Sequence, residues 1–323
     1  MEQTMKLLGC LIGLAACYAV GAIAQTFPDR PVRVVIPQIP GGTSDVLGRI
    51  VAQKLTDKWG RTVVIENRPG AGGNIGTDAV AKSAPNGYTW LLTYVGSHAI
   101  NPTLYKQLPF DPVKDLAAVA TLAMAPFVLV ANVDLPAKNM AEFVALARSS
   151  PGKLNYGAQH GAVNHLLGQL LNFKAGVQTI WVPYRGAADS LTDTISGRLQ
   201  FNYGSAGAVA QQVRAGKVRA LASTGSRRME SLKDVPTMLE SGFPDLTVDS
   251  WWGVFVATGT PPAIVRKINT DVNEVLGMPD VVERFAGVGA EPYPMTPEQF
   301  SKIAEDDIRK WRDVVIQSGV KLE

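Results

Sequence analysis

The residues best placed to do chemistry in this sequence lie in a glycine turn, residues 41–45, between a β-branched run and a stretch with helical spacing. Gly41 and Gly42 have no side chain and accept positive φ, so a ligand can come close to the backbone. We expect Thr43 or Ser44 to cap the following helix, ahead of Asp45, and the first N–H groups of that helix carry a partial positive charge. Such a turn suits a carboxylate. The alternative is that these residues form only a turn and an N-cap.

Neutral polar side chains follow several other predicted strands, where they can donate hydrogen bonds to a small polar solute in a cleft. They are Ser97 after TYVG, then Gln159, His160, Asn164 and His165 after NYGA, then Tyr184 after WVP, and finally Asn202 and Ser205 on either side of YG. Arg185 is the one cation among them, and its guanidinium can pair with a second carboxylate in bidentate geometry. For each residue taken alone, capping or surface exposure is an equally good explanation.

Other kinds of site fit the sequence poorly. Starting from Gly70, the run GAGGNIG has Ile75 at the sixth place, where a dinucleotide fingerprint needs Gly, and the chain contains no Gly-Lys-Ser or Gly-Lys-Thr. The histidines number three, and His160 and His165 are five residues apart, a poor spacing for metal ligands on one helix face. No Gly-x-Ser-x-Gly nucleophile elbow occurs. We therefore expect no cofactor, no metal and no catalysis, with a secreted hydrolase as an alternative.

The first residues predict export. A lone lysine precedes the apolar run LLGCLIGLAACYAV, and GAIAQ then places small residues at Ala22 and Ala24, which predicts a signal peptide over residues 1–24. The apolar run is too short for a membrane span. Cleavage after Ala24 removes Cys10 and Cys17, the only two cysteines, which excludes disulfides and thiol chemistry in the mature chain. A lipid-anchored Cys17 after LAA is the alternative processing.

Composition and patterning predict a large α/β protein. The 323 residues are 46% hydrophobic and 18% charged with a net charge of +3, so the chain can bury an ample core and has no basic surface for nucleic acid. Short apolar runs such as VRVVIP and FVLVAN alternate with amphipathic helical stretches, which predicts mostly parallel sheets flanked by helices. Trp251 and Trp252 are adjacent in one strand, so at most one of them can face a pocket.

Each half of the chain has the order strand, turn, helix, strand, turn, helix, which predicts two lobes. The segments 122–138 and 218–228 are the candidate connections, and two connections form a hinge beside a cleft. We expect lobe 1 to contain residues 25–124 and 225–290, and lobe 2 residues 125–224. Residues 291–323 form a helical segment that the pattern assigns to neither lobe.

The sequence resembles the tripartite tricarboxylate transporter receptor family, also called the Bug family. The resemblance runs in order over the whole mature chain and is carried by FPDRPVRVVIPQIPGGTSDVLGRIVAQKL, VVIENRPGAGGNIGTDAVAKSAPNGYTWLL, SPGKLNYGAQHGAVNHLLGQLL, VPYRGAADSLTDTISGRLQ and WWGVFVATGTPP. Two places depart from the family pattern: Gln38 and Ile39 stand before the glycine turn, and Gln159 and His160 make the turn before His165 bulkier.

The resemblance implies a periplasmic solute-binding protein with the two-lobed type II, Venus-flytrap fold. It implies that Pro40, Gly41, Gly42 and the residues through Asp45 hold one carboxylate of the solute, and that the turn after NYG and the VPYRG stretch form the opposite wall. It also implies partners, namely the membrane permease subunits of a tripartite tricarboxylate transporter, and we expect a monomer that does not bind nucleic acid. A sensor that passes its bound state to a signalling partner is the alternative role. The solute classes range from tricarboxylates through dicarboxylates and acidic amino acids to aromatic carboxylates such as terephthalate, and the neutral donors with one spare Trp favour a dicarboxylate, either aliphatic or aromatic.

Overall fold

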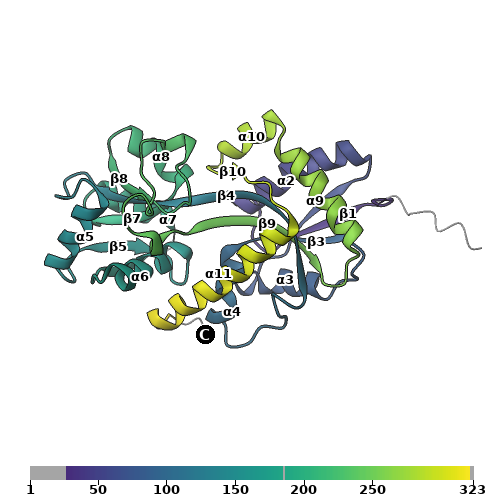
Figure 1. The fold of residues 1–323 in the computed structure, drawn as a ribbon, viewed down its shortest axis with the longest axis horizontal. Helices are drawn as coiled ribbons and strands as arrows, with labels where there is room; N and C mark the ends of the chain where they lie inside the picture. Colours follow the sequence, from purple (N-terminus) through teal and green to yellow (C-terminus); the bar gives the residue numbers. More distant parts are fainter. Residues whose placement is uncertain (1–26, 185, 321–323) are drawn as a thin grey trace, which may run out of the picture.

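The computed structural model describes residues 27–184 and 186–320. The predicted signal peptide over residues 1–24, with both cysteines, lies outside these residues, and so does Arg185. Among the described residues, no helix combines the length and the apolar character that crossing a bilayer requires. The fold is two-lobed and mixed α/β, with one continuous sheet and helices on its faces (Figure 1).

Lobe 1 is built on the strand order β2-β1-β3-β9-β4, in which β1, β2 and β3 are parallel and β9 is antiparallel to its neighbours. The β1 residues Val32, Val35 and Ile36 are fully buried, as expected for a strand covered on both faces. The strands are β1 (Val32–Ile36), β2 (Val63–Asn67), β3 (Thr89–Tyr94), β9 (Asp249–Ala257) and the first part of β4 (Leu116–Asn132). The helices are α2 (Thr43–Trp59), α3 (Asn74–Ala81), α9 (Pro262–Leu276) and α10 (Pro279–Ala286).

Lobe 2 continues the sheet from the second part of β4, with β7, β5 and β6 on one edge and β8 on the other. Its strands are β5 (Asn155–Ala158), β6 (Ile180–Pro183), β7 (Phe201–Ser205) and β8 (Val218–Ser223). Its helices are α5 (Met140–Ser149), α6 (Val163–Ala175), α7 (Ala187–Ile195) and α8 (Ala206–Arg214). Strands β5, β6 and β7 run parallel, so their carboxyl ends share one edge of the lobe, and that edge faces lobe 1.

The strands β4 and β9 join the two lobes. β4 is 17 residues long and passes from one lobe into the other without interruption (Figure 1). On the lobe 1 side Met124 pairs with Trp251, and on the lobe 2 side Phe127 pairs with Ser205 of β7. The register shifts three times along β4, twice before Pro126 and once after it. Because bulges bend a strand locally, β4 can change direction between the lobes without losing its pairing.

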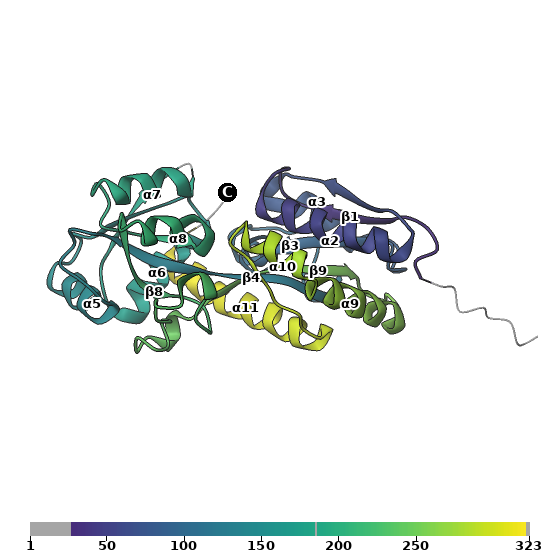
Figure 2. The same cartoon turned by 90° about the horizontal axis from the view of Figure 1, so that it is seen from above.

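The last helix, α11 (Pro297–Ser318), packs on both lobes. It begins at a capping box formed by Thr296 and Gln299 and lies along the crossover strands (Figure 2). It contacts β4, the π-helical turn η3 (Gly96–Ile100) and the short helix α4 (Asn101–Leu104) on the lobe 1 side, and α6 on the lobe 2 side. Trp311 of α11 is fully buried, and Asp307 accepts a 2.8 Å hydrogen bond from Trp251 Nε1. The terminal segment that the sequence pattern assigned to neither lobe therefore contacts both.

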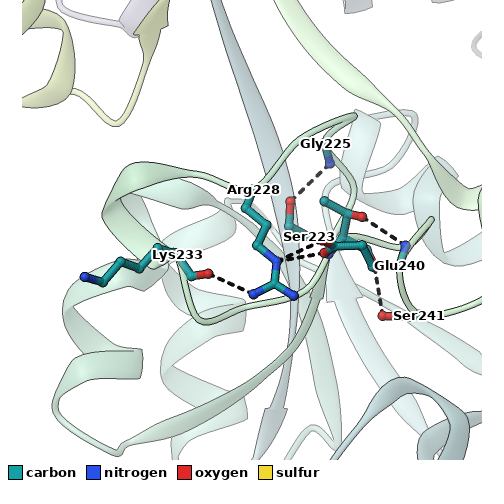
Figure 3. Close-up of polar contacts among 7 residues, drawn as sticks. Ser223, Gly225, Arg228, Lys233, Glu240 and Ser241 are labelled. Carbon is teal, nitrogen blue, oxygen red and sulfur yellow. Dashed lines mark hydrogen bonds and ion pairs between the residues drawn. The ribbon is translucent and has the colours of Figure 1, made fainter.

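The segment between β8 and β9 packs with lobe 2. Its short helical turns are η4 (Glu230–Leu232) and η5 (Pro244–Leu246), and it is tied together by polar contacts in which Arg228 binds Glu240 and donates to the Lys233 carbonyl (Figure 3). Met229, Leu232 and Val235 belong to the same buried cluster as the lobe 2 part of β4. These contacts favour lobe 2 for residues 229–235, which the sequence analysis grouped with lobe 1. The division of the chain into lobes otherwise stays a prediction.

Candidate functional site

A cavity of about 260 Å³ lies where the two lobes face each other. Lobe 1 contributes the end of β3 and the turn after it, the crossover strand β4 contributes Phe127, and lobe 2 contributes the loops that follow β5, β6 and β7. The lining residues are Tyr94, Gly96, Asn101, Phe127, Gln159, Gly161, Ala162, Val163, Asn164, Ala187, Tyr203 and Ser205. Among the described lining residues no side chain carries a charge, so main-chain dipoles are the source of the positive potential that these residues offer.

Three helices of lobe 2 begin at the wall of this cavity. Ala162 is the N-cap residue of α6, Ala187 is the first residue of α7, and Ser205 is the N-cap residue of α8. None of the three helices has a side-chain cap, a feature they share with α9 and α10, which do not line the cavity. Uncapped first-turn N–H groups carry partial positive charge, and three sets of them directed at one cavity favour an anion there.

The turn before α6 is held in place by His165. The Gly161 N–H donates to His165 Nδ1 at 3.1 Å, which makes Nδ1 the acceptor and places the ring proton on Nε2. The ring stacks on Trp181 at 4.2 Å between centroids. Burial, with a smaller contribution from the nearby His160, lowers the pKa of His165 to about 4, so the ring is neutral at pH 7. His165 therefore supports the wall from behind, while Gln159 and Asn164 lie on it.

On β7 the alternation of side chains decides which residues reach the cavity. Tyr203 and Ser205 share one face of the strand and line the cavity, whereas Asn202 lies on the other face and donates a 2.8 Å hydrogen bond to Ser190 Oγ. The sequence analysis grouped Asn202 with Ser205, although residues three apart in a strand point in opposite directions. Tyr203, which the sequence pattern did not single out, lines the cavity in place of Asn202.

Two further predicted residues of lobe 2 lie outside the cavity lining. The Tyr184 hydroxyl donates to Asp193 Oδ2 at 2.5 Å, and this hydrogen bond, together with burial, raises the pKa of Tyr184. The exposed His160 stacks on Trp181 with ring centroids 5.3 Å apart. Both side chains therefore have partners within lobe 2.

The lobe 1 wall is a network of side-chain amides and hydroxyls. The Gly72 carbonyl accepts from Ser97 Oγ at 2.8 Å and from Asn101 Nδ2 at 2.9 Å, and Asn101 Nδ2 also reaches Asn74 Oδ1 at 2.9 Å. Gln38 Nε2 lies 3.3 Å from Ser97 Oγ. Asn101 is the member that lines the cavity, while Ser97 is buried behind it and joins the turns after β1, β2 and β3.

The turn over residues 40–45 belongs to lobe 1 but does not line the cavity. Gly41 has a φ of +83°, Gly42 is the N-cap residue of α2, and no side chain caps this helix. The prediction that Thr43 or Ser44 caps α2 is therefore wrong, because the helix begins at Thr43 and both side chains lie inside its first turn. The Ser44 hydroxyl instead accepts a 3.1 Å hydrogen bond from Trp252 Nε1.

Asp45 stabilises this turn from within. Its carboxylate accepts from the Gly41 N–H at 2.9 Å, from Arg49 Nε at 3.0 Å and from Asn67 Nδ2 at 3.0 Å. Burial alone would raise the pKa of Asp45, but these hydrogen bonds and the charge of Arg49 outweigh it and hold the pKa below its usual range. The carboxylate is thus ionised at neutral pH and directed at the turn, which leaves the exposed main chain of Pro40 and Gly41 facing outward.

Residues with other chemistry lie inside the lobes. His98 is fully buried, stacks on Phe255 at 4.2 Å, and has its pKa lowered to about 3 by burial. Trp251 is also fully buried, so neither it nor Trp252, which binds Ser44, lines the cavity. Within residues 27–184 and 186–320, no three His, Cys, Asp or Glu side chains form a group that could hold a metal ion.

The sequence analysis missed several residues of the cavity wall. Tyr94, Gly96 and Asn101 surround the predicted Ser97, and a signal for them was available, since they follow the same strand end. Phe127 could not be found in this way, because it lies in the middle of β4 and reaches the cavity only through the crossing between lobes.

Comparison with known proteins agrees with this geometry. Residues 47–320 match the family model described as "Tripartite tricarboxylate transporter family receptor". The chain is similar to "Protein BugT" of Bordetella pertussis, with 35% identity over 100% of this chain and 99% of the relative.

Three solved structures are similar over nearly the whole chain. The R. palustris protein Rpa4515 with adipate has 34% identity and a TM-score of 0.74, with 91% of this chain and 99% of that chain covered. MatC (Rpa3494) from Rhodopseudomonas palustris with bound malate has 32% identity and a TM-score of 0.71, with 90% and 100% covered. A TctC solute-binding protein from Polaromonas with no ligand has 25% identity and a TM-score of 0.83, with 90% and 100% covered.

Proposed function

Because the chain belongs to the tripartite tricarboxylate transporter receptor family, we propose that it captures a small dicarboxylate in the cavity between its lobes and delivers it to a membrane permease of that transporter class. The observation that carries the proposal is the convergence of three uncapped helix N-termini, at Ala162, Ala187 and Ser205, on a cavity whose described lining residues have no charged side chain. Receptors of this family bind solutes, and their fold is that of binding proteins.

Lobe closure completes the site. The chain is more similar in overall shape to the ligand-free Polaromonas protein than to the adipate and malate complexes, although its sequence is less similar to the former. This supports an open arrangement, in which the turn over residues 40–45 stands away from the lobe 2 wall. Closure then brings the uncapped main-chain N–H groups of Gly42 and Thr43, at the start of α2, to the second carboxylate of the solute. Since only the closed form makes both sets of contacts, the solute shifts the population toward it.

The cavity favours short dicarboxylates. Its volume of about 260 Å³ lies just below the usual range for ligand sites, which begins at about 300 Å³. Similar proteins bind adipate and malate, which supports aliphatic dicarboxylates of this length for the present chain. Tyr94, Phe127 and Tyr203 provide ring surface around a chain of methylene groups.

Binding proceeds without covalent chemistry. The hydroxyl of Ser97 donates to the Gly72 carbonyl, and His165 uses Nδ1 to accept from Gly161, so each of these groups has a partner that supports the wall. Incubating the purified protein with esters and amides of its ligand is expected to release no product. Steady product release that a single Ser or His substitution abolishes would instead support the hydrolase alternative.

The proposal is tested by measuring the melting temperature with a series of aliphatic dicarboxylates, followed by calorimetry on those that raise it. The matched controls are the diamides of the same acids, which have similar shape and no charge. We expect dicarboxylates to stabilise the protein and diamides to have no effect. Equal stabilisation by dicarboxylates and diamides, or no stabilisation by either, would contradict an anion site at the helix N-termini.

For the cellular role, we propose export through the signal peptide over residues 1–24, a monomer in the periplasm, and delivery to permease subunits. Receptors of this family are periplasmic, which supports this location. Deleting the gene is expected to abolish uptake of the identified solute. If deletion leaves uptake intact and abolishes only induction of other genes by the solute, the sensor alternative is correct.

A further inference from the structure

The two lobes touch through the backbones of two glycines. Gly207 is the second residue of α8 in lobe 2, and Gly289 lies in the loop between α10 and the short strand β10 (Glu291–Pro292) of lobe 1. A Cβ on Gly207 would lie 2.6 Å from Gly289 Cα and 3.0 Å from Gly289 N, and a Cβ on Gly289 would meet Gly207 even more closely. The obstacle on each side is backbone, so no side-chain rotation can relieve the clash.

This contact lies beside the crossover strand. Ser205, two residues before Gly207, pairs with Phe127 of β4, and Glu291, two residues after Gly289, pairs with Met124. The two glycines therefore meet next to the point at which β4 passes from one lobe to the other. On the same flank Arg227 lies 3.4 Å from Glu291, which adds a second contact across the lobes.

The conformation of α8 does not explain glycine at position 207. Gly207 lies within the helix and has no positive φ, and there an alanine is more favourable than glycine by about 0.5–1 kcal/mol. The residue is also exposed. The lack of a side chain matters for the neighbouring lobe, because only glycine allows α8 and the loop at Gly289 to come into backbone contact.

We propose that the contact between Gly207 and Gly289 fixes the spacing of the two lobes beside the hinge and thereby selects the length of the solute. The selectivity part rests on the proposed function of the cavity. Ser205, the N-cap residue of α8, lines the cavity, and Gly207 lies on the first turn of the same helix. A methyl group at Gly207 displaces this turn, and Ser205 with it, away from the lobe 1 wall formed by Tyr94 and Asn101. The widened cavity then fits longer dicarboxylates better than short ones.

The test compares Gly207→Ala with Gly277→Ala. Gly277 follows α9 at an exposed position with a φ of −80°, and a Cβ there would lie 3.5 Å from the nearest atom, an ordinary contact. Spin labels on Asp57→Cys in α2 and Ala145→Cys in α5, in a chain with Cys10 and Cys17 replaced by Ser, report the distance between lobes. Calorimetry with malate and adipate reports selectivity.

We expect Gly207→Ala to lengthen the distance between labels and to change the ratio of the malate and adipate Kd values about tenfold in favour of adipate, which is about 1.4 kcal/mol. Gly277→Ala should change neither. Gly289→Asn is the reciprocal variant, since Asn tolerates positive φ, and it should act in the same direction.

The role of the glycines in lobe spacing and their role in selecting solute length are contradicted by different outcomes. An unchanged label distance in both folded Gly207→Ala and Gly289→Asn contradicts the role of the contact in lobe spacing. A longer distance with an unchanged Kd ratio contradicts the link to solute length. If the unsubstituted protein binds no dicarboxylate, the proposed function fails and length selection fails with it, while the label distance still decides whether the glycines set the spacing.

Discussion

The two walls of the cavity are made of different chemical groups. The lobe 2 wall presents main-chain N–H groups at the starts of α6, α7 and α8, with no side-chain caps. The lobe 1 wall is a closed network in which Gln38, Ser97, Asn101 and Asn74 bind one another and the Gly72 carbonyl. We infer that the lobe 2 wall of the cavity supplies the positive potential that recognises one carboxylate, and that the lobe 1 wall of the cavity supplies a fixed surface that recognises shape.

Because the two walls differ in this way, substitutions in them should affect ligand affinity and folding stability differently. An unsatisfied helix terminus is less stable than a capped one, so lobe 2 gives up stability at the positions where an anion can replace the cap. In lobe 1 the side chains of Ser97, Asn101 and Asn74 already have partners, whereas the buried Gln38 Oε1 has none, so a substitution in this network mostly removes hydrogen bonds from the protein itself. A capping substitution in the lobe 2 wall should therefore raise stability and lower affinity, whereas a substitution in the lobe 1 network should lower both.

The largest effect is expected from Ala162→Asp in the lobe 2 wall. Ala is a poor N-cap residue and Asp a good one, so the free energy of unfolding without ligand should rise by about 1 kcal/mol. The new carboxylate occupies the N–H groups of α6 and repels the solute, so we expect affinity to fall by about two orders of magnitude, or roughly 2.7 kcal/mol. Urea unfolding and calorimetry measure the two changes.

The matched control is Ala162→Asn, which caps the helix without adding charge. It should give a similar gain in stability and a smaller loss of affinity than Ala162→Asp. If Ala162→Asp binds dicarboxylates as well as the unsubstituted protein does, the lobe 2 wall is not the source of the positive potential.

The next effect is expected from Asn101→Ala in the lobe 1 wall. It removes the hydrogen bonds to Gly72 and Asn74, so stability should fall by about 1–3 kcal/mol, and affinity should fall by about tenfold because Asn101 also lines the cavity. Asn74→Ala is the control, since Asn74 belongs to the network but not to the lining. Equal losses of affinity in the two variants would mean that the network acts only through the fold.

A smaller effect is expected at the turn over residues 40–45. Asp45→Ala removes the acceptor for the Gly41 N–H and should loosen the turn, so affinity should fall by about threefold to tenfold with the fold intact, as measured by calorimetry and circular dichroism. Ser44→Ala removes only the acceptor for Trp252 and should cost less. Unchanged binding by Asp45→Ala would exclude this turn from the site.

The last effect is a dependence of stability on pH. The pKa of His165 is about 4 in the folded chain against an ordinary value of 6.5, so the unfolded chain binds more protons between these values. The stabilising contribution is therefore complete above about pH 6.5 and decreases as the pH falls toward 4. Urea unfolding between pH 7 and 4 should have a shallower pH dependence in His165→Gln, with the buried His98 acting in the same direction in both proteins. An identical pH dependence would contradict a neutral His165.

The parts of this protein that follow from local pattern could be predicted, and those that follow from lobe packing could not. The run VRVVI predicts a buried strand, and the glycines after it predict a turn, which is what the β1–α2 unit shows. The strand–turn pattern singled out Gln159, which directly follows β5, Asn164 in the first turn of α6, and Ser205 at the end of β7, and all three line the cavity. Phe127 was missed, since its role comes from the path of β4 between lobes, and the lobe 2 packing of Met229 depends on contacts with residues about a hundred positions earlier.

The order of strands in lobe 1 has a consequence for how the chain folds. β9, at residues 249–257, lies between β3 and β4, so the sheet that starts at residue 32 stays incomplete until more than two hundred further residues have been synthesised. Most strands of lobe 2 are contiguous and can pair earlier. Contacts between such distant segments slow folding. We therefore expect lobe 2 to form first during synthesis and lobe 1 to assemble around it only when the last third of the chain has appeared.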